Sequence, residues 1–404
     1  MQQQSAYRRW LAVFLLCMGA FFLKSPDAYL NPQFWAEDAV IFFKQQWNHE
    51  WPRILVPYAG YYHLLPRVAA WLASFFPIGL APALYNLTAL VVASASIAYF
   101  LQRLSSVSLA LVAFLGLFLT PTNGEVFGTL TNSQWFVQFF LLAACFLPAS
   151  ASHLRWIMPV LVLGGALTGP FSAMMLAMHA VLLAASRLPQ RWQLTSWVSS
   201  FVSALDPWRL IALWAGGLTQ IGVALSASGQ KPVEFSLHTI LSAIAGMSQT
   251  HTFGMRLMPA ILFLGLLVLI LLLILHGNLS ARLKGLIVIS CGVALLQIAF
   301  GSIKPKLMAD VLGVGDRYFV LFKVMFWLSA HIALSRFAWL GGSRALMAIV
   351  LCVVLVAANN RSHLVRAPLP DIHWTEATRS LPADREAVID IHPRPWTLTL
   401  PPKE

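Results

Sequence analysis

The chain has 404 residues, of which 58% belong to the hydrophobic set and only 10% are charged. Soluble globular chains are about 45–50% apolar, and a membrane-spanning helix needs about 20 apolar residues in succession. This composition excludes a soluble domain, a disordered chain and a disulfide-stapled secreted fold. The long apolar runs also exclude an outer-membrane barrel, whose strands alternate over short segments. We therefore expect an all-α polytopic membrane protein.

The formal charge of +12 arises from 27 Lys and Arg against 15 Asp and Glu. In a soluble protein this excess would suggest nucleic acid. Here the basic residues lie in short loops beside apolar runs, so we expect the charge to set membrane orientation and predict no nucleic-acid partner. The cysteines lie inside apolar stretches without metal spacing, and we expect them to be buried small hydrophobes. They are Cys17, Cys145, Cys291 and Cys352.

Eleven apolar runs predict about 11 transmembrane helices. They cover residues 8–24, 79–101, 107–120, 135–150, 156–169, 170–186, 209–226, 257–276, 285–302, 318–335 and 345–358. With the N-terminus in the cytoplasm, the short loops on that side hold most of the Arg residues, which fits the positive-inside rule. Every Asp and Glu except Asp206 then lies on the outer side. We therefore expect the polar chemistry to take place on the outer face.

The first outer loop, residues 25–78, contains a segment with helical periodicity. Asn31 followed by Pro32 is typical of a helix start. Aromatic and apolar residues then recur on one face, so we expect residues 31–47 to form a helix lying at the membrane interface. Residues 61–76, bounded by Pro77, predict a second interfacial helix.

Glu37 and Asp38 lie in the first turn of the first interfacial helix. One interpretation is simple stabilisation by the helix dipole. A functional role is favoured because an ionised side chain at membrane depth is costly. Adjacent helical residues point about 100° apart, so we expect one acid to face the site and the other to hold a neighbour. The cations available as neighbours are Lys44, Arg53 and Arg67.

The chain divides into a transmembrane domain, residues 1–358, and a Pro-rich outer tail, residues 359–404. Two strand-like pieces in the tail, residues 387–391 and 396–400, favour a small β-hairpin. The tail is too small to be an enzyme domain by itself. It either shapes the acceptor site or caps the fold.

Four strings resemble bacterial GT-C class membrane glycosyltransferases, including those that add glucose to O-antigen of lipopolysaccharide. They are Phe34-Trp-Ala-Glu-Asp38, Tyr58-Ala-Gly-Tyr-Tyr-His-Leu-Leu-Pro-Arg67, Leu130-Thr-Asn-Ser-Gln-Trp135 and Gly315-Asp-Arg-Tyr-Phe319. The resemblance in architecture covers nearly the whole chain. It implies a GT-C-like fold in the bacterial inner (cytoplasmic) membrane and a periplasmic active site. The implied partners are a polyprenyl-phosphate sugar donor, a glycan or lipid-linked acceptor, and membrane lipids.

By this resemblance Asp38 or Glu37 is the general base for an inverting transfer, with Asp38 slightly favoured. A carboxylate that accepts the acceptor hydroxyl proton fits general-base chemistry. The polyprenyl-phosphate leaving group needs cations rather than an acid. Glycosidases instead use a spaced pair of carboxyl groups, which two adjacent helix residues do not match.

The donor phosphate requires Lys or Arg at the outer interface. The candidates are Arg317, Lys306, Lys304, Arg67 and Arg256. Arg317 opens a span, and we expect Asp316 to hold it in place. Packing of a charge-paired loop explains the basic residues of the 302–317 segment equally well.

Other polar and aromatic residues are candidates for the sugar and acceptor site through hydrogen bonds and ring stacking. They are Tyr61, Tyr62, His63, Asn132, Gln134, Trp135 and Tyr318. His63 either assists the base or anchors the loop at the interface. We predict no metal and no other cofactor, because one Glu-Asp pair supplies few oxygen ligands. The rival functions are a transporter or flippase of a lipid-linked sugar, which needs charges within the spans, and a non-catalytic assembly subunit.

Overall fold

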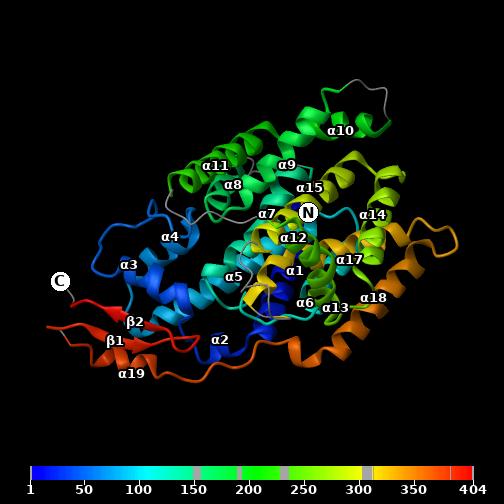
Figure 1. The fold of residues 1–404 in the computed structure, drawn as a ribbon. Coiled ribbons are helices and arrows are strands. Elements are labelled where there is room, and N and C mark those ends of the chain that lie inside the picture. Colours follow the sequence, from blue (N-terminus) through cyan, green and yellow to red (C-terminus); the bar gives the residue numbers. More distant parts are fainter. Residues whose placement is uncertain are drawn as a thin grey trace.

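The computed structural model describes residues 2–148, 156–188, 193–227, 236–302, 312, 314–382 and 384–402. Within these ranges the chain is mostly helical, and a two-stranded hairpin lies near the C-terminus (Figure 1). Each of the eleven predicted spans contains a helix. These are α1 (Gln2–Lys24), α5 (Ala81–Arg103), α6 (Val107–Phe118), α7 (Gln134–Phe146), α8 (Met158–Ala166), α9 (Phe171–Ala185), α11 (Pro207–Ser226), α14 (Ala260–His276), α15 (Ala281–Ser302), α17 (Val320–Leu334) and α18 (Gly341–Asn359).

Among the described residues, five helical segments are long and apolar enough to cross a membrane. They are Ile78–Arg103, Pro207–Ser226, Ala281–Ser302, Gly315–Leu334 and Gly341–Asn359. Several shorter apolar helices accompany them, α6, α9 and α14 among these. The helices and their apolar composition agree with a membrane protein, while the full set of eleven spans stays a prediction.

Small residues and buried glutamines hold the helices together. Gly216 on α11 lies against Ala166 on α8, and Gly116 on α6 lies against Trp327 on α17, so that helix backbones approach closely. The Gln297 side chain on α15 donates to Gln138 Oε1 on α7 at 2.5 Å. Interhelical contacts of this kind replace the hydrophobic effect, which offers little drive for association inside lipid.

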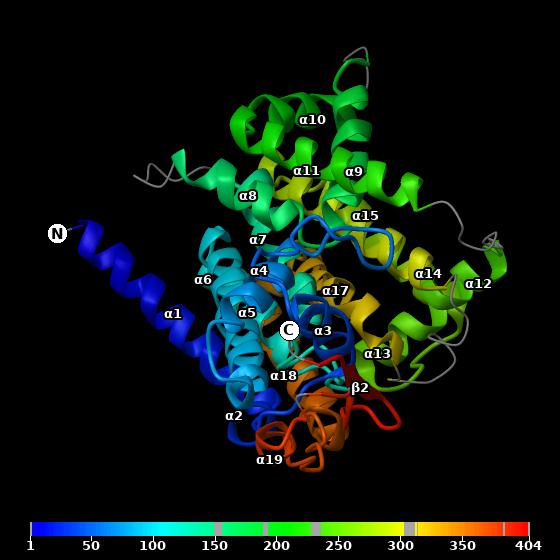
Figure 2. The ribbon, with the colours of Figure 1, turned by 90° about the vertical axis from the view of Figure 1, so that its left-hand side faces the viewer.

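The remaining helical turns are short and connect or flank the long helices. They are α2 (Asp27–Leu30), η1 (Asp38–Phe43), α3 (Lys44–Gln46), α4 (Leu64–Ala73), η2 (Ile78–Leu80), η3 (Thr131–Ser133), α10 (Gln193–Ser203), α12 (Leu237–Ser242), η5 (Ala243–Met247), α13 (Ser248–Phe253), η6 (Val314–Phe319), η7 (Arg361–His363) and α19 (Trp374–Arg379). Figure 2 shows α2 beside α19, and α1 projecting from the bundle towards the N-terminus. Cys352 on α18 is exposed, so the expectation that all four cysteines are buried is wrong for this residue.

The first interfacial helix starts later than the sequence predicts. Asn31 ends α2 instead of beginning a helix, and Phe34 and Ala36 form backbone hydrogen bonds with His392 of the tail. These long-range bonds hold the backbone extended up to Trp35, which overrides the local Asn-Pro signal. The turn that follows is a π-helix, η1, with Asp38 in its first turn.

The tail is packed onto the first long loop rather than standing apart. Its strands β1 (Ala387–Asp390) and β2 (Thr397–Leu400) pair antiparallel, with Ala387 opposite Leu400. Trp374 on α19 meets the ring of Phe34 edge-on at a centroid distance of 4.8 Å. Trp47 Nε1 donates to the Pro401 carbonyl at 3.2 Å. The hairpin thus lies against the segment that carries the acidic pair (Figure 1).

Arg366 connects the tail to two further segments. Its buried guanidinium donates to Asp27 Oδ2 at 2.8 Å and to the Phe127 carbonyl at 3.1 Å. Gly124 has a left-handed backbone with φ of 84° and packs so closely on Arg366 that a side chain there would overlap it. The tail therefore fixes the loop formed by residues 121–133.

Replacing Arg366 with Ala should test this connection. The substitution leaves Asp27 buried without its cation, and breaking a buried ion pair from one side costs about 3–5 kcal/mol. We expect R366A to lower the free energy of unfolding by about 3 kcal/mol, seen as a lower midpoint of thermal unfolding in detergent. The exposed neighbour Arg361 is the control, and R361A should change stability by less than about 0.5 kcal/mol. Equal losses in both variants would contradict the bridging role.

Candidate functional site

Asp38 is fully buried and holds the backbone of the 121–133 loop. Its two carboxylate oxygens accept the amide N–H of Leu130 at 2.8 Å and of Thr131 at 2.7 Å. These amides precede α7, so the carboxylate occupies the position of an N-terminal cap. Burial raises the pKa of Asp38 to about 7, the two amide hydrogen bonds oppose the rise, and the charge of Glu37 adds to it.

Glu37 is partly buried and lies among charged and phenolic groups. Its charge raises the pKa of Asp38, of Tyr58 and of Glu125, although burial is the larger cause for each. It also interacts electrostatically with Arg317. The two acids therefore differ: both oxygens of Asp38 accept backbone amides, whereas the charge of Glu37 acts on the side chains of Tyr58, Glu125 and Arg317.

Glu125, a loop residue, is the ionic partner of Arg317. Arg317 Nε lies 3.6 Å from Glu125 Oε1, and its guanidinium carbon lies 5.5 Å from the centroid of the Tyr318 ring. Burial raises the pKa of Glu125 to about 8, and Arg317 opposes this rise. The expectation that Asp316 holds Arg317 is wrong, because the two adjacent side chains of η6 point to different partners.

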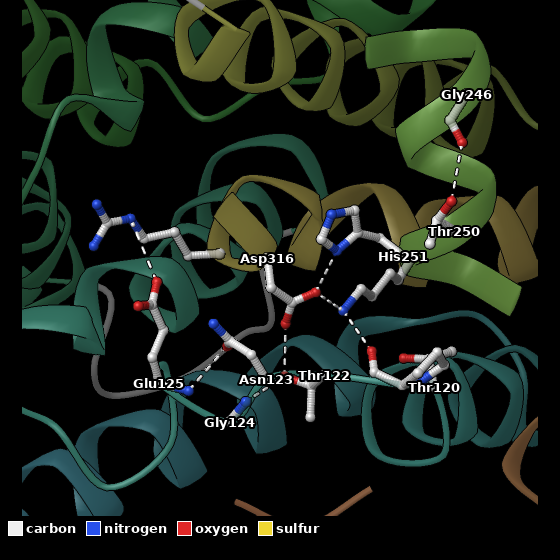
Figure 3. A network of polar contacts seen from close by, with 12 residues as sticks. Thr120, Thr122, Asn123, Gly124, Glu125, Gly246, Thr250, His251 and Asp316 are labelled. Carbon is white, nitrogen blue, oxygen red and sulfur yellow. Dashed lines mark hydrogen bonds and ion pairs between the residues drawn. The ribbon is translucent and has the colours of Figure 1, made fainter. Parts of the chain in front are cut away.

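Asp316 instead forms the centre of a buried network (Figure 3). Its Oδ1 lies 2.7 Å from His251 Nδ1 and 2.5 Å from Lys323 Nζ, and its Oδ2 accepts the Thr122 hydroxyl at 2.6 Å. Lys323 also donates to the Pro121 carbonyl at 2.8 Å. His251 stacks on Phe319 with a centroid distance of 4.0 Å. The network joins η6, α13, α17 and the 121–133 loop, and so holds in place the backbone from which the Arg317 side chain extends.

Aromatic side chains form two ring pairs near Arg317 and the first long loop. The rings of Tyr61 and His63 stack at a centroid distance of 4.4 Å, and Trp135 meets Tyr318 edge-on at 5.2 Å. Tyr61 also shares a hydrogen bond with Gln134. Burial lowers the pKa of His63 to about 3, so this ring is neutral and its buried Nδ1 has no partner among the described residues. That these aromatic residues bind the sugar and acceptor stays a prediction.

Arg67 is a buried cation without a hydrogen-bonding partner. Its side chain is 1% exposed, and its Nε, Nη1 and Nη2 atoms make no hydrogen bond within the described part of the chain. The guanidinium carbon lies 5.1 Å from the centroid of the Phe42 ring. Burial lowers the pKa of Arg67 to about 10, which leaves it charged at neutral pH. A desolvated cation of this kind is costly unless an anion joins it.

Five predicted site residues do not point into this cluster, or cannot be placed. Lys304 and Lys306 lie outside the described residues. Arg256 is exposed and lies beside Gly246. The Asn132 side chain donates to the Glu125 carbonyl and to Thr129 within its own loop. Tyr62 is tied by its backbone to Gln220 on α11.

Sequence reasoning missed the Asp316 network and the role of Glu125. A single lysine within the apolar run that follows Asp316 signals a buried partner, because an unpaired charge inside a span is costly. The seven-residue spacing of Asp316 and Lys323 places both on one helical face over two turns. Nothing local identifies His251 as the third member, since its contact depends on the tertiary fold.

No protein-family model, curated protein or solved structure matches this chain. The residues of the described ranges also contain no group of three or more His, Cys, Asp and Glu placed to hold a metal ion. The chemistry of the site must therefore be argued from its own geometry. That geometry combines a proton acceptor, a buried unpaired cation and stacked aromatic rings, a set suited to a polar ligand with an anionic group.

The raised pKa of Asp38 predicts a pH dependence of stability. The folded state holds the proton more tightly than the unfolded chain, whose Asp pKa is about 4. This contribution is present in full below pH of about 4 and is lost as the pH rises to about 7. We expect the unfolding midpoint of the wild type to fall more steeply over this range than that of D38N. The same slope in both proteins would show that Asp38 does not titrate there.

Proposed function

We propose that the chain is an inverting membrane glycosyltransferase of the GT-C type, which transfers a sugar from a polyprenyl-phosphate donor to a cell-envelope glycan or lipid. Its active site lies on the outer face of the bacterial inner membrane. The observation that carries the proposal is the combination of an acidic pair with a buried arginine that lacks an anion. A transfer that expels a lipid phosphate needs both a proton acceptor and cations at the leaving group.

In this proposal Glu37 and Asp38 have different roles. Glu37 accepts the proton of the acceptor hydroxyl, because it is the member whose charge acts on Tyr58 and Arg317. Asp38 holds the 121–133 loop through the amides of Leu130 and Thr131. This assignment reverses the slight preference for Asp38 stated in the sequence analysis, since both oxygens of Asp38 accept backbone amides.

Arg67 and Arg317 are the cations that bind the donor phosphate. Beyond the larger effect of burial, the charge of Arg67 lowers the pKa of His63 and that of Arg317 lowers the pKa of Tyr61, so each cation acts on one ring of the stacked pair. The neutral His63 ring and Tyr61 offer a stacking surface for a sugar. The phosphate then supplies the negative charge that the buried Arg67 lacks.

Conservative substitution of the acidic pair tests the catalytic assignment. We expect E37Q to lower turnover at least about 100-fold, the usual contribution of a general base, without changing the unfolding midpoint. Transfer is measured by mass analysis of envelope glycans and by incorporation of labelled sugar in membranes. Glu50, an exposed acid of the same loop, gives the matched control, and E50Q should retain full transfer. Wild-type transfer by E37Q at normal expression would exclude Glu37 as the base.

Replacing Arg67 with Met separates a ligand-binding cation from a structural one. Because Arg67 has no anionic partner, its neutral isostere should raise the unfolding midpoint of the free protein. The same variant should raise the donor KM about tenfold or more, since it removes a charged hydrogen bond to phosphate. R379M, at an exposed position on α19, should change neither quantity. A destabilised R67M with unchanged donor KM would assign Arg67 a structural role.

One observation favours the alternative of a transporter or flippase. The Asp316, Lys323 and His251 network places charges within a candidate membrane span, as transport of a charged headgroup would need. A flippase moves labelled lipid-linked sugar across vesicles with no covalent transfer. The glycosyltransferase instead yields a glycosylated acceptor, so the two functions differ in product.

A further inference from the structure

A cavity of about 760 Å³ lies at the end of the helical bundle away from the acidic pair. It is formed where α6 and α18 begin, where α17 ends, and where α14 turns into α15. In Figure 1 the α17–α18 turn lies at the right, across the molecule from the C-terminal hairpin. The loop charges place this end in the cytoplasm. The cavity is therefore separate from the site proposed above, and the failure of one proposal would not decide the other.

The segments that form the cavity are strongly cationic. The three segments that form it are residues 102–108, 277–284 and 335–344, and they contain five Lys and Arg residues and no Asp or Glu. The five are Arg103, Arg282, Lys284, Arg336 and Arg344. Of these, Arg336 lines the cavity itself. No acid in these segments neutralises its guanidinium, so the segments attract an anion.

Hydrogen-bond donors without partners face the same cavity. Gly342 and Ser343 line it from the first turn of α18, which has no side-chain cap; the Gly341 amide donates to the Phe337 carbonyl, and the Gly342 and Ser343 amides have no acceptor inside the helix. Such a helix end favours an anion. Independently, His331 lines the cavity with a side chain that is 4% exposed, and its Nδ1 has no hydrogen-bond partner within the described residues. Ser108 and Ser335 add hydroxyl groups to the wall.

The other half of the cavity is apolar and opens onto the outer surface of α18. Leu283, Ile332 and Leu346 line this half together with Met347. Met347 is 64% exposed and begins a stripe that continues one and two turns further at Leu351 and Leu355, both more than half exposed. A polar, cationic pocket that continues into an apolar helix face fits a ligand with an anionic head and a hydrocarbon tail.

We propose that this cavity binds the phosphate group of an anionic phospholipid from the membrane leaflet on the cationic side. Arg336, the first-turn amides of α18 and His331 hold the phosphate, while an acyl chain lies along Met347, Leu351 and Leu355. The site is distinct from the donor site because it lies at the opposite end of the bundle and shares no residue with it.

Binding of defined lipids to the full purified chain in detergent tests the proposal. Native mass spectrometry would count bound dioleoyl phosphatidylglycerol, with dioleoyl glycerol as the lipid that lacks phosphate and inorganic phosphate as the headgroup without chains. We expect one tightly bound phosphatidylglycerol, no comparable binding of dioleoyl glycerol, and at most weak binding of inorganic phosphate. R336Q should weaken phosphatidylglycerol binding about tenfold or more, because a charged hydrogen bond is lost.

Two variants keep the outcome interpretable. R187Q removes an exposed arginine from the same predicted side of the membrane, remote from the residues that line the cavity, and should leave lipid binding unchanged. H331F retains the ring but removes the Nδ1 group, and should weaken binding without any change of net surface charge. Equal weakening by R336Q and R187Q would show non-specific charge attraction and overturn the site. Tight inorganic phosphate binding that phosphatidylglycerol does not displace would assign the cavity to free phosphate and overturn the lipid.

Discussion

The carboxylate of Asp38 on the amides of Leu130 and Thr131 is the contact around which the polar part of this protein is arranged. It joins the first long loop to the loop that leads into α7, two segments about ninety residues apart in the chain. The amides it accepts belong to the 121–133 loop that also carries Glu125, the partner of Arg317. Moving Asp38 would therefore displace both Glu37, the adjacent acid in the chain, and Arg317, whose ionic partner Glu125 lies in this loop.

The C-terminal tail secures this arrangement from the other side. His392 pairs with the backbone of Phe34 and Ala36, directly before Glu37. Arg366 meanwhile holds the Phe127 carbonyl in the 121–133 loop. The tail thus forms hydrogen bonds with both segments that Asp38 joins. These contacts explain why Ala36 keeps a left-handed backbone, with φ of 26°, which alanine rarely adopts.

Apolar runs predicted where helices form, because burial in lipid demands long apolar segments whose backbone bonds are satisfied internally. The acidic pair was also found from sequence, since charge at membrane depth stands out. The helix start at Asn31 was not predictable, because the hydrogen bonds that suppress it come from His392, far away in the chain. The prediction of the partner of Arg317 was wrong for a similar reason. Proximity in sequence favoured Asp316, but Lys323, His251 and Thr122 together outcompete Arg317 for that carboxylate.

Three buried cations differ in whether an acidic side chain of the protein neutralises them. Lys323 lies on Asp316, and Arg366 lies on Asp27, so each is neutralised within the chain. Arg67 is buried as deeply as either, yet within the described part of the chain it forms no ion pair or hydrogen bond through its guanidinium, which lies over the face of the Phe42 ring. A cation–π contact contributes about 2 kcal/mol when desolvated, which is less than the several kcal/mol needed to remove a charged group from water. In the proposed function the donor phosphate offsets this deficit at Arg67, beside His63, whose pKa burial and the charge of Arg67 both lower.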